Sequence, residues 1–460
     1  MNRKLAASIL AAVMAASGLA GCGSAGTTTT APAADASEDS SAAADGAKDT
    51  AAADASGASA DANSLTVWTW DPTFNIYAMQ EAEKFYQKDH PDFKLNLVEV
   101  LSDDIETKIT TAASSGDLST LPDIFLMQDN SFQKYMANFP EVFTDLTDSG
   151  IDYSQFGAGK QAYSTKDGRH YGVPFDNGAV IGAYRTDYLE QAGLTLDDFT
   201  DITWDQYIEL GKKVKEATGQ PCLTSQAGSP DLLMMMLQSC GASLFKEDGS
   251  VNIVGNEQLV KAMDYYQQMI DAGILVEVTD WDQYIASIQN GTVAGVVNGC
   301  WIIGSITAAK DQSGKWGVTN MPRLDGVDGA VNYSNNGGSS WAVCTATQNK
   351  DLAIDFLNST FGSNVEFYEE ILPSSGAIAT YLPAGESDVY SQPQEFFGGE
   401  AIYSKIIEFA GHVPSNITGA YYYDARDAVG VALSNMIQQG ADRDSELQTA
   451  QDTVEFNMGG

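Results

Sequence analysis

Residues 65–70 have the sequence LTVWTW, and this stretch decides the fold class of the chain. Alternation and a high content of β-branched and aromatic residues predict a β-strand here. A mixed polar and apolar stretch that ends before Pro91 predicts a helix, and residues 95–100 predict a second strand. A helix at 103–114 and a short buried strand at 124–127 follow. Strands that alternate with helices indicate α/β units with parallel strand pairing.

The remaining elements are predicted from caps and periodicity. Thr203 can cap a helix that ends at Gly219, and a second helix with Leu259 on its apolar face ends at Gly273. Further strands are expected at 292–298 and 340–344, a helix at 351–361 and two helical segments after Gly411. From Ser64 onward about 400 residues remain, more than one hydrophobic core usually supports, so we expect two lobes.

The N-terminus has a different character. Arg3 and Lys4 precede an apolar run that ends at Leu19, and small residues lead to Cys22. This pattern describes a secretory signal peptide, because the run is shorter than the about 20 apolar residues that a membrane-spanning helix needs. The cysteine after Leu-Ala-Gly resembles a bacterial lipoprotein signal. That resemblance implies that Cys22 is lipidated and anchors the protein to the extracellular face of the cell membrane.

The next segment, residues 23–63, contains no Leu, Ile, Val, Met or aromatic residue. Such a composition cannot bury enough apolar area to offset the entropy of ordering, so we expect a disordered tether. A flexible coil of this length has a root-mean-square span of about 35 Å. We therefore divide the chain into a signal peptide at 1–22, a tether at 23–63 and a folded body at 64–460.

The net charge of −38 argues against nucleic acid or an anionic lipid surface as a partner. No segment after the signal peptide offers 18 consecutive apolar residues, so the lipid on Cys22 would be the only membrane anchor. The other cysteines form no C-x-x-C pair and have no histidine nearby, so we expect no zinc site. A Cys222–Cys240 disulfide and four buried thiols remain open alternatives for Cys222, Cys240, Cys300 and Cys344.

Motifs of common enzymes and metal sites are missing from the sequence. None of the 3 histidines lies in an H-E-x-x-H pattern, and there is no G-x-S-x-G elbow, Walker loop or G-x-G-x-x-G after a strand. A carboxylate pair for glycoside hydrolysis could still assemble from the 62 acidic residues, because folding and not spacing sets such pairs. We expect a protein that is no enzyme, with no catalytic residue, cofactor or metal.

Aromatic rings stand next to short polar side chains where three predicted strands end. These groups are Trp70 with Asp71, then Gln128, Asp129 and Asn130, and then Asn298 with Trp301. Ligands of open α/β sheets bind beyond the carboxyl ends of the strands. A pyranose ring stacks its apolar face on an indole or phenol ring, while its hydroxyl groups bond with Asp, Asn and Gln side chains. An anion would need arginines, so this pattern predicts a site for a neutral sugar.

Each tryptophan also has a packing interpretation. Trp68 alternates with Trp70, so one of them faces the core, and we favour Trp70 as the exposed one because it adjoins Asp71. A single tryptophan such as Trp301 more often packs in a core than binds a ligand. Packing roles are expected for Trp204, Trp316 and Trp341.

The order of segments resembles the extracellular solute-binding proteins of ABC importers, specifically the carbohydrate-binding group called family 1, which is related to maltose-binding protein. The matching stretches are LTVWTWD (65–71), LPDIF (121–125), YGVPFDN (171–177), GAYRTD (182–187), TWDQY (203–207), NGTVAGVVNGCW (290–301), WGVTNMP (316–322) and NKDLAIDF (349–356). The resemblance implies an α/β, two-lobed periplasmic-binding-protein-like fold of type II, with a ligand cleft between hinge-connected lobes.

The resemblance also implies lobe boundaries and a hinge. Lobe 1 is expected at about 64–175 plus about 325–365, and lobe 2 at about 180–320 plus about 370–460. The chain would cross between the lobes near Val173–Ala183 and Met321–Gly338. Two lobes joined in this way open and close about a hinge, and a ligand that contacts both lobes favours the closed form.

Position by position, the resemblance places Trp301 where the family stacks a sugar ring and Tyr422 on its aromatic C-terminal helix, where most relatives have tryptophan. Asp129, or Asn130 one residue on, matches an acceptor for sugar hydroxyl groups. Asp176 and Asn177 lie at the first crossing, where both lobes can reach a ligand, and Gly338 and Ser339 precede the strand expected at 340–344.

These observations predict a lipid-anchored, monomeric substrate-binding protein that captures a mono- or oligosaccharide and delivers it to the permease subunits of an ABC importer. Three alternatives remain open. The same fold could bind a peptide, polyamine or polyol, the protein could be a surface glycoside hydrolase, or it could present its ligand to a membrane kinase as a sensor.

Overall fold

The computed structural model describes residues 57–459. The expected signal peptide and most of the expected tether lie outside the described residues. The last part of that tether is described, and it is bound to the body: the backbone N–H of Ala58 donates to the Leu121 carbonyl at 2.8 Å, and that of Ser59 to the Asp123 carboxylate at 2.8 Å. The predicted start of the body at Ser64 is therefore too late. Hydrogen bonds from the backbone N–H groups of Ala58 and Ser59 hold this segment, and apolar composition alone does not reveal such bonds.

Lobe 1 is built on the parallel strands that the sequence predicts. Its first elements are β1 (Ser64–Thr69), α1 (Asn75–Gln87), β2 (Lys94–Glu99), α2 (Ser102–Ser115), β3 (Ile124–Gln128) and α3 (Asp129–Asn138). Strand β1 lies between β2 and β3 and pairs with both in parallel, which confirms the expected α/β pairing. Helix α4 (Ala158–Ala162) and the short strands β4 (Thr165–Lys166) and β5 (Arg169–His170) follow.

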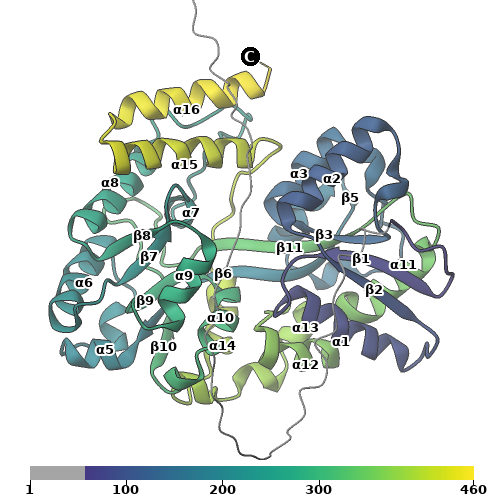
Figure 1. Ribbon diagram of the computed structural model, residues 1–460, viewed down its shortest axis with the longest axis horizontal. Helices are drawn as coiled ribbons and strands as arrows, with labels where there is room; N and C mark the ends of the chain where they lie inside the picture. The colour runs from purple at the N-terminus through teal and green to yellow at the C-terminus, as the bar shows by residue number, and fades with distance from the viewer. Residues whose placement is uncertain (1–56, 460) are drawn as a thin grey trace, which may run out of the picture. The chain divides into compact units, whose positions relative to one another are not determined.

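Two long antiparallel strands, β6 (Val173–Arg185) and β11 (Asn335–Val343), connect the lobes (Figure 1). The second half of β11 pairs with β3 in lobe 1, while the second half of β6 pairs with β9 (Gly295–Gly299) and β10 (Trp316–Thr319) in lobe 2. The sheet has the order β10-β6-β11-β3-β1-β2, with β9 also on β6. Strand β6 covers the first crossing expected at Val173–Ala183, whereas β11 begins only at Asn335 and overlaps the second, expected at Met321–Gly338, at its end alone.

Lobe 2 surrounds the far end of these crossing strands. Its elements are α5 (Thr186–Gln191), α6 (Trp204–Thr218), β7 (Leu223–Gln226), α7 (Asp231–Gln238), α8 (Glu257–Asp271), β8 (Leu275–Val278), α9 (Trp281–Gln289), α10 (Ile303–Thr307), α14 (Ile402–Gly411), α15 (Tyr422–Gln439) and α16 (Arg443–Asn457). The cap predicted for α6 is confirmed, because Gln206 N–H donates to Thr203 Oγ1 at 3.3 Å and Gly219 ends the helix with φ of 75°.

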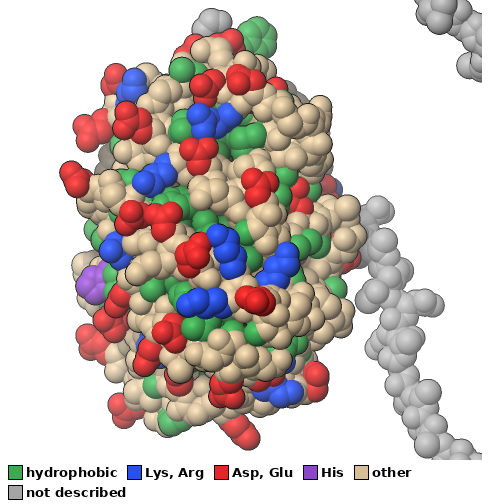
Figure 2. Space-filling view, turned by 90° about the vertical axis from the view of Figure 1, so that its left-hand side faces the viewer, with side chains coloured by type: hydrophobic (Ala, Val, Ile, Leu, Met, Phe, Trp, Pro, Cys, Tyr) green, Lys and Arg blue, Asp and Glu red, His purple; other side chains and the backbone are tan. Residues whose placement is uncertain are grey.

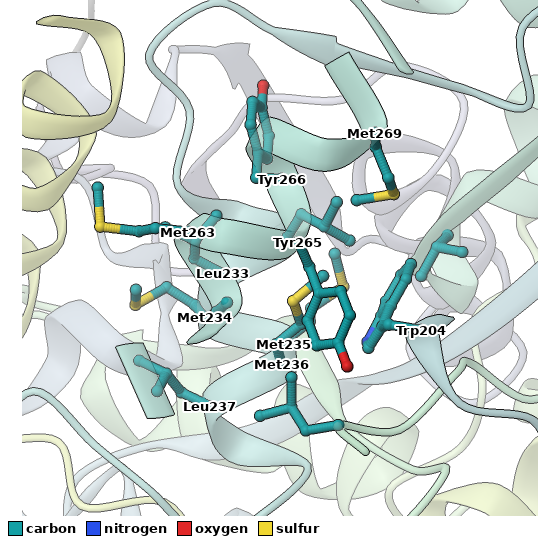
Figure 3. Packing of buried hydrophobic residues seen from close by; sticks show 14 of the residues in the cluster. Trp204, Leu233, Met234, Met235, Met236, Leu237, Met263, Tyr265, Tyr266 and Met269 are labelled. Carbon is teal, nitrogen blue, oxygen red and sulfur yellow. The ribbon is translucent and has the colours of Figure 1, made fainter. Parts of the chain in front are cut away.

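The core of lobe 2 is rich in methionine. Figure 3 shows Met235 and Met236 of α7 beside Trp204 and Tyr265. Trp204 is fully buried, and flexible methionine side chains fill the irregular space around such large rings. The packing roles expected for tryptophans are confirmed, since Trp68, Trp204, Trp316 and Trp341 are all buried.

Lobe 1 continues further along the chain than the expected limit near residue 365. Helix α11 (Lys350–Leu357) ends in a π-helical turn at Asn358–Gly362, and α12 (Val365–Ser375) and α13 (Leu382–Gly385) follow. Phe367 and Ala384 pack in the same core as Leu65 of β1. The boundary is therefore later than expected, because apolar residues of α12 and α13 complete the lobe 1 core.

The surface of lobe 2 mixes charges of both signs. Figure 2 shows lysine and arginine side chains scattered among aspartate and glutamate on this face.

All four described cysteines are free thiols: Cys222, Cys300 and Cys344 are buried and Cys240 is half-buried. Within residues 57–459 no helix is long and apolar enough to cross a membrane, and no group of three or more His, Cys, Asp or Glu side chains could hold a metal ion.

Candidate functional site

A cavity of about 780 Å³ lies between the lobes, beside the crossing strands. Its volume falls within the about 300–1,000 Å³ typical of small-molecule sites. Residues from α1, α2, β3, α3 and the segment that follows β1 line it in lobe 1, and residues from α7, α9, α10 and α15 line it in lobe 2. The cavity is therefore lined by both lobes, which the crossing strands connect.

The structure brings together most of the residues proposed from sequence. The cavity lining includes Trp70, Asp71, Gln128, Asn130, Asp176, Trp301, Gly338, Ser339 and Tyr422. They come from six separate parts of the chain, so the fold assembles them at one place.

Three proposed residues are not among those that line the cavity: Asp129, Asn177 and Asn298. The Asp129 carboxylate is buried and bound by Lys160 and by the Ser340 hydroxyl. Asn298 Oδ1 accepts a bond of 2.8 Å from Asn336 Nδ2. The Asn177 carbonyl accepts from the Cys300 thiol at 3.1 Å. Other protein groups thus bind the side-chain oxygens of Asp129 and Asn298, whereas for Asn177 the bond is to the main-chain carbonyl. A ligand contact of these three residues stays a prediction.

Asn130, the other candidate acceptor on this segment, differs from Asp129. Its Oδ1 atom is buried and has no hydrogen-bond partner within the described part of the chain. Buried polar atoms in folded proteins nearly always have a partner. Asn130 lines the cavity, so a ligand hydroxyl or a water molecule could satisfy this acceptor.

The lobe 1 wall is fixed where β1 ends. Asn75 Oδ1 accepts from the backbone N–H groups of Trp70 at 3.1 Å and Asp71 at 2.8 Å. Asp71 in turn accepts from the Thr73 N–H at 2.8 Å. These bonds hold Trp70 half-buried at the cavity, whereas Trp68 is 1% exposed, as the alternation predicts.

A buried charged cluster adjoins the cavity at Asp176 and Ser339, which line it. Lys160 Nζ donates to Asp129 and, at 2.7 Å, to the Ser339 carbonyl, while Asp176 accepts from the Ser339 hydroxyl. Burial raises the pKa of Asp129 to about 6, and it also raises the pKa of Asp176, although Lys160 opposes both shifts. Lys160 thus binds Asp129 directly and acts on Asp176 through its charge alone. Gly338 has φ of 103°, and a Cβ there would lie 2.6 Å from Asp129 Oδ2, so no larger residue fits.

The lobe 2 wall carries a pair of tryptophans. The rings of Trp281 and Trp301 lie 5.8 Å apart and are tilted by 45°, and Trp281 stacks on Tyr284 at 5.0 Å. The Trp301 indole donates a bond of 2.8 Å to the Asn336 carbonyl on β11. Trp281 is 43% exposed. Both indoles line the cavity and offer ring faces at different orientations.

Sequence reasoning missed Trp281. The tetrapeptide WDQY occurs twice, at 204–207 and at 281–284, yet Trp204 is 0% exposed and Trp281 is 43% exposed. One signal was available: Trp281 begins a helix capped by Asp280, directly after the strand β8. A tryptophan at the start of a helix that follows a strand is therefore worth considering as a ligand contact.

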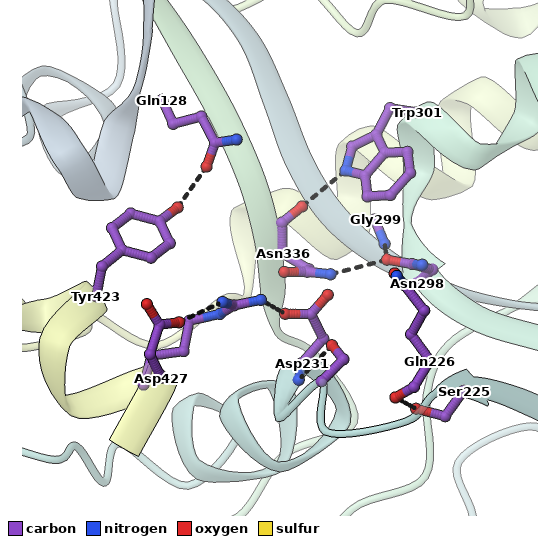
Figure 4. A network of polar contacts seen from close by, with 12 residues as sticks. Gln128, Ser225, Gln226, Asp231, Asn298, Gly299, Trp301, Asn336, Tyr423 and Asp427 are labelled. Atoms are coloured by element: carbon purple, nitrogen blue, oxygen red, sulfur yellow. Dashed lines mark hydrogen bonds and ion pairs between the residues drawn. The ribbon is translucent and has the colours of Figure 1, made fainter. Parts of the chain in front are cut away.

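The first turn of α15 lines the cavity with Tyr422, Tyr423 and Asp424, of which only Tyr422 was predicted from the sequence. The Tyr423 hydroxyl donates to Gln128 Oε1, and Lys134 Nζ lies 2.9 Å from Asp424 Oδ2. Figure 4 shows the first of these contacts together with Asp231 and Asp427. The Arg426 guanidinium pairs with both of these aspartates, at 2.5 Å and 3.2 Å. The run YYYDAR at 421–426 is the sequence signal for this wall of the cavity.

Acidic residues outnumber basic ones around the cavity. Its acidic lining residues are Asp71, Asp103, Glu106, Asp176, Asp231, Asp424 and Asp427, and its basic ones are Lys134 and Arg426. Both bases are ion-paired, Lys134 with Asp424 and Arg426 with Asp231. Among the described lining residues no cation is left for an anionic ligand, whereas aromatic faces and hydrogen-bonding groups remain available.

Comparisons with known proteins agree with this architecture. Residues 81–369 match the family described as bacterial extracellular solute-binding protein. A lactose-binding protein of Rhizobium radiobacter is 39% identical over 403 residues, which cover 88% of this chain and 95% of that protein. An arabinooligosaccharide-binding protein of Halalkalibacterium halodurans is 23% identical, with 86% and 90% covered.

Solved structures share the fold at low sequence identity. The ABC transporter associated binding protein from B. animalis subsp. lactis Bl-04, in complex with β-1,6-galactobiose, has a TM-score of 0.71 and 22% identity, with 85% of this chain and 96% of that chain covered. A maltose-bound binding protein of T. maritima has a TM-score of 0.71 and 17% identity, with 85% and 99% covered. The chain therefore belongs to the bacterial extracellular solute-binding proteins and has the two-lobed α/β fold of the type II periplasmic binding proteins.

Proposed function

We propose that the protein is the substrate-binding component of an ABC importer and captures a neutral saccharide in the cavity between its lobes. The observation that carries this proposal is the lining itself. Trp70 from lobe 1 and Trp281 and Trp301 from lobe 2 all line the cavity, while both of its basic residues are already paired with aspartates. Aromatic faces stack on sugar rings, and side-chain amides and carboxylates bond with their hydroxyl groups.

The mechanism follows from the connection between the lobes. Ligand contacts on both walls form together only when the lobes are closed, so binding energy shifts the population toward closure. The crossing strands β6 and β11 supply the hinge region. Register shifts interrupt their pairing between Asn335 and Gly338 and between Ser339 and Ser340, where a change of angle costs little pairing.

The relatives support a short saccharide as the ligand. The relative at 39% identity is named for lactose, and solved neighbours of the same fold hold β-1,6-galactobiose, lacto-N-biose and maltose. The buried, unpartnered Oδ1 of Asn130 provides one acceptor suited to a hydroxyl group. We propose a disaccharide, with lactose as the first compound to test.

The remaining parts of the proposal concern location and delivery. Cys22 follows a signal-like segment and would carry the lipid that holds the protein at the extracellular face of the cell membrane. Residues between Cys22 and the body would act as the tether. The closed, loaded form would then dock on the permease subunits as a monomer.

Isothermal titration of the purified body tests this function. The panel contains lactose, β-1,6-galactobiose, maltose, an arabinooligosaccharide and mannitol, with a thermal melt for each because a ligand of the native state raises the melting temperature. We expect at least one disaccharide to bind in the micromolar range or tighter and to be recovered intact. Release of reducing ends would instead indicate a glycoside hydrolase, and binding of none of the saccharides would refute the proposal.

One observation favours a second candidate, a cationic amine such as a polyamine. The acidic excess around the cavity and its three indole faces would both attract a cation. Spermidine and putrescine therefore belong in the same titration. Amine binding that weakens steeply with salt, together with no response to saccharides, would replace the first proposal by the second.

A further inference from the structure

Two contacts join the lobes directly at the α15 end of the cavity. The Tyr423 hydroxyl donates to Gln128 Oε1, and Lys134 Nζ lies 2.9 Å from Asp424 Oδ2. Gln128 and Lys134 belong to β3 and α3 of lobe 1, whereas Tyr423 and Asp424 are adjacent in the first turn of α15 of lobe 2. All four side chains line the cavity. We call these two contacts the end bridge.

Both sides of the end bridge are held in place by their own lobes. On the lobe 1 side, α3 begins at Asp129, whose buried carboxylate is bound by Lys160. On the lobe 2 side, Ala425 is fully buried in the core. The Arg426 guanidinium lies 5.5 Å from the centre of the Tyr423 ring and pairs with Asp231 at the start of α7. The bridge therefore connects two fixed positions.

The chemistry of the bridge is consistent with a persistent contact. Burial raises the pKa of Tyr423 above its usual value, so the phenol stays protonated and donates a hydrogen bond to the neutral amide oxygen of Gln128. The Lys134 and Asp424 side chains are 34% and 18% exposed, which screens their attraction less than at an open surface. A chain of sugar rings cannot pass between a donor and an acceptor that are in contact.

We propose that the end bridge closes one end of the ligand cavity and thereby limits the length of the saccharide, with Tyr423 as the specificity-determining residue. This inference rests on the proposed function and deepens it. A longer saccharide that extends toward α15 must break both contacts of the bridge. Losing a hydrogen bond and a partly buried ion pair corresponds to a loss of about tenfold in the binding constant.

Titration with saccharides of increasing length tests the inference. The probes are lactose and its galactosyl extensions with three and four rings, or the matching series on whichever disaccharide of the panel binds. We expect the native protein to lose about tenfold or more in affinity between two rings and four. In the double variant Tyr423→Ala/Lys134→Ala that loss should shrink to about threefold or less.

Milder variants keep the test independent of folding. Tyr423→Phe keeps the ring and removes only the donor, and Lys134→Met removes the charge, so each should give an intermediate length dependence. Matched controls are Tyr421→Phe, the neighbouring tyrosine outside the lining, and Lys212→Met, whose ion pair with Glu209 lies within lobe 2. Thermal melts establish that each variant is folded, and the controls should keep the native length dependence.

The experiment distinguishes failure of the length limit from failure of the proposed saccharide-binding function. Equal affinity of the native protein for two, three and four rings overturns the length limit and leaves the saccharide-binding function intact. A native length preference that survives in Tyr423→Ala/Lys134→Ala also overturns it, because the limit would then lie elsewhere. No binding of any saccharide refutes the proposed function, and this inference falls with it.

Discussion

The indole Nε1 of Trp301 donates a hydrogen bond of 2.8 Å to the main-chain carbonyl of Asn336. This bond connects the ring-bearing wall of lobe 2 to the crossing strand β11, so the ring face that lines the cavity has a fixed orientation. A fixed aromatic ring loses little rotamer entropy when a ligand stacks on it. Trp301 therefore has the properties of a residue that concentrates binding energy.

Replacing this residue tests its role. Trp301→Ala should lower saccharide affinity by about 2 kcal/mol or more, roughly thirtyfold, because aromatic anchors carry much of the energy of an interface. Trp301→Phe should lose less, since it keeps a stacking face but not the bond to Asn336. Calorimetric titration measures both. Unchanged affinity in the alanine variant would remove Trp301 from the site.

Trp281 should serve a different sugar ring from Trp301. The two indoles are tilted by 45°, so one flat pyranose cannot stack fully on both. Trp281→Ala should weaken disaccharide binding by about 0.5–1.5 kcal/mol and leave the affinity for the matching monosaccharide unchanged. Trp301→Ala, by contrast, should weaken binding of both. An equal loss for mono- and disaccharide in Trp281→Ala would contradict the assignment of separate rings.

Lys160 should be essential for stability and not only for the site. Its ammonium group is the cation bound to Asp129, and its removal leaves two buried carboxyl groups with hydroxyl donors but no nearby cation in the described part of the chain. Lys160→Met should lower the free energy of unfolding by about 3–5 kcal/mol, as measured by urea denaturation. The exposed pair of Lys212 gives a control, because Lys212→Met should cost less than about 1 kcal/mol.

The same cluster predicts a pH dependence of stability. Burial raises the pKa of Asp129 from 3.8 to about 6 and raises that of Asp176, so the folded chain keeps protons that the unfolded chain has lost. Stability from these groups is therefore fully present below about pH 4 and decreases as the pH rises through 6, by about 1.4 kcal/mol per unit of raised pKa.

Asp176→Asn isolates this effect. The amide oxygen can still accept from the Ser339 hydroxyl, while Asp129 remains alone with Lys160. The variant should melt at a higher temperature than the native protein at pH 7, and the difference should vanish near pH 4. A constant difference across that range, or none at pH 7, would show that the two carboxyl groups do not compete for one lysine.

The membrane anchor has a separate test. Cys22→Ser should move the protein from the membrane fraction to the soluble extracellular fraction, because a hydroxyl group cannot replace the thiol as the lipid acceptor. Detergent extraction of the native protein, followed by mass measurement of its N-terminal peptide, provides the control. Continued membrane association of the serine variant would rule out Cys22 as the anchor.

Local signals in the sequence were sufficient for most elements of the fold. The capping box of Thr203 and Gln206 and the strand at 65–70 depend on neighbouring residues, and both are confirmed. The choice between Trp68 and Trp70 was also correct, because strand alternation decides it. The strand expected at 292–298 begins only at Gly295, where pairing with Tyr184 of β6 starts, and such a partner is invisible to local analysis.

Contacts across the cavity could not be predicted in the same way. Gln128 and Tyr423 are 295 residues apart, and nothing in either neighbourhood indicates the other. Asp129 and Asn130 are adjacent, yet one is bound by Lys160 and the other has an unpartnered oxygen at the cavity. The residue types at the site were therefore predictable, whereas the function of each side chain depends on the tertiary structure.

The route of the chain through β6 and β11 has a practical consequence for dissection of the protein. Lobe 1 contains both early and late segments of the chain, so neither half of the polypeptide, if cut near residue 320, encodes a complete lobe. A fragment that ends there would leave β3 and the first half of β6 without their shared neighbour β11, as two exposed strand edges prone to aggregation. Work on an isolated lobe would need lobe 2 to be excised and the flanking strands rejoined by a turn.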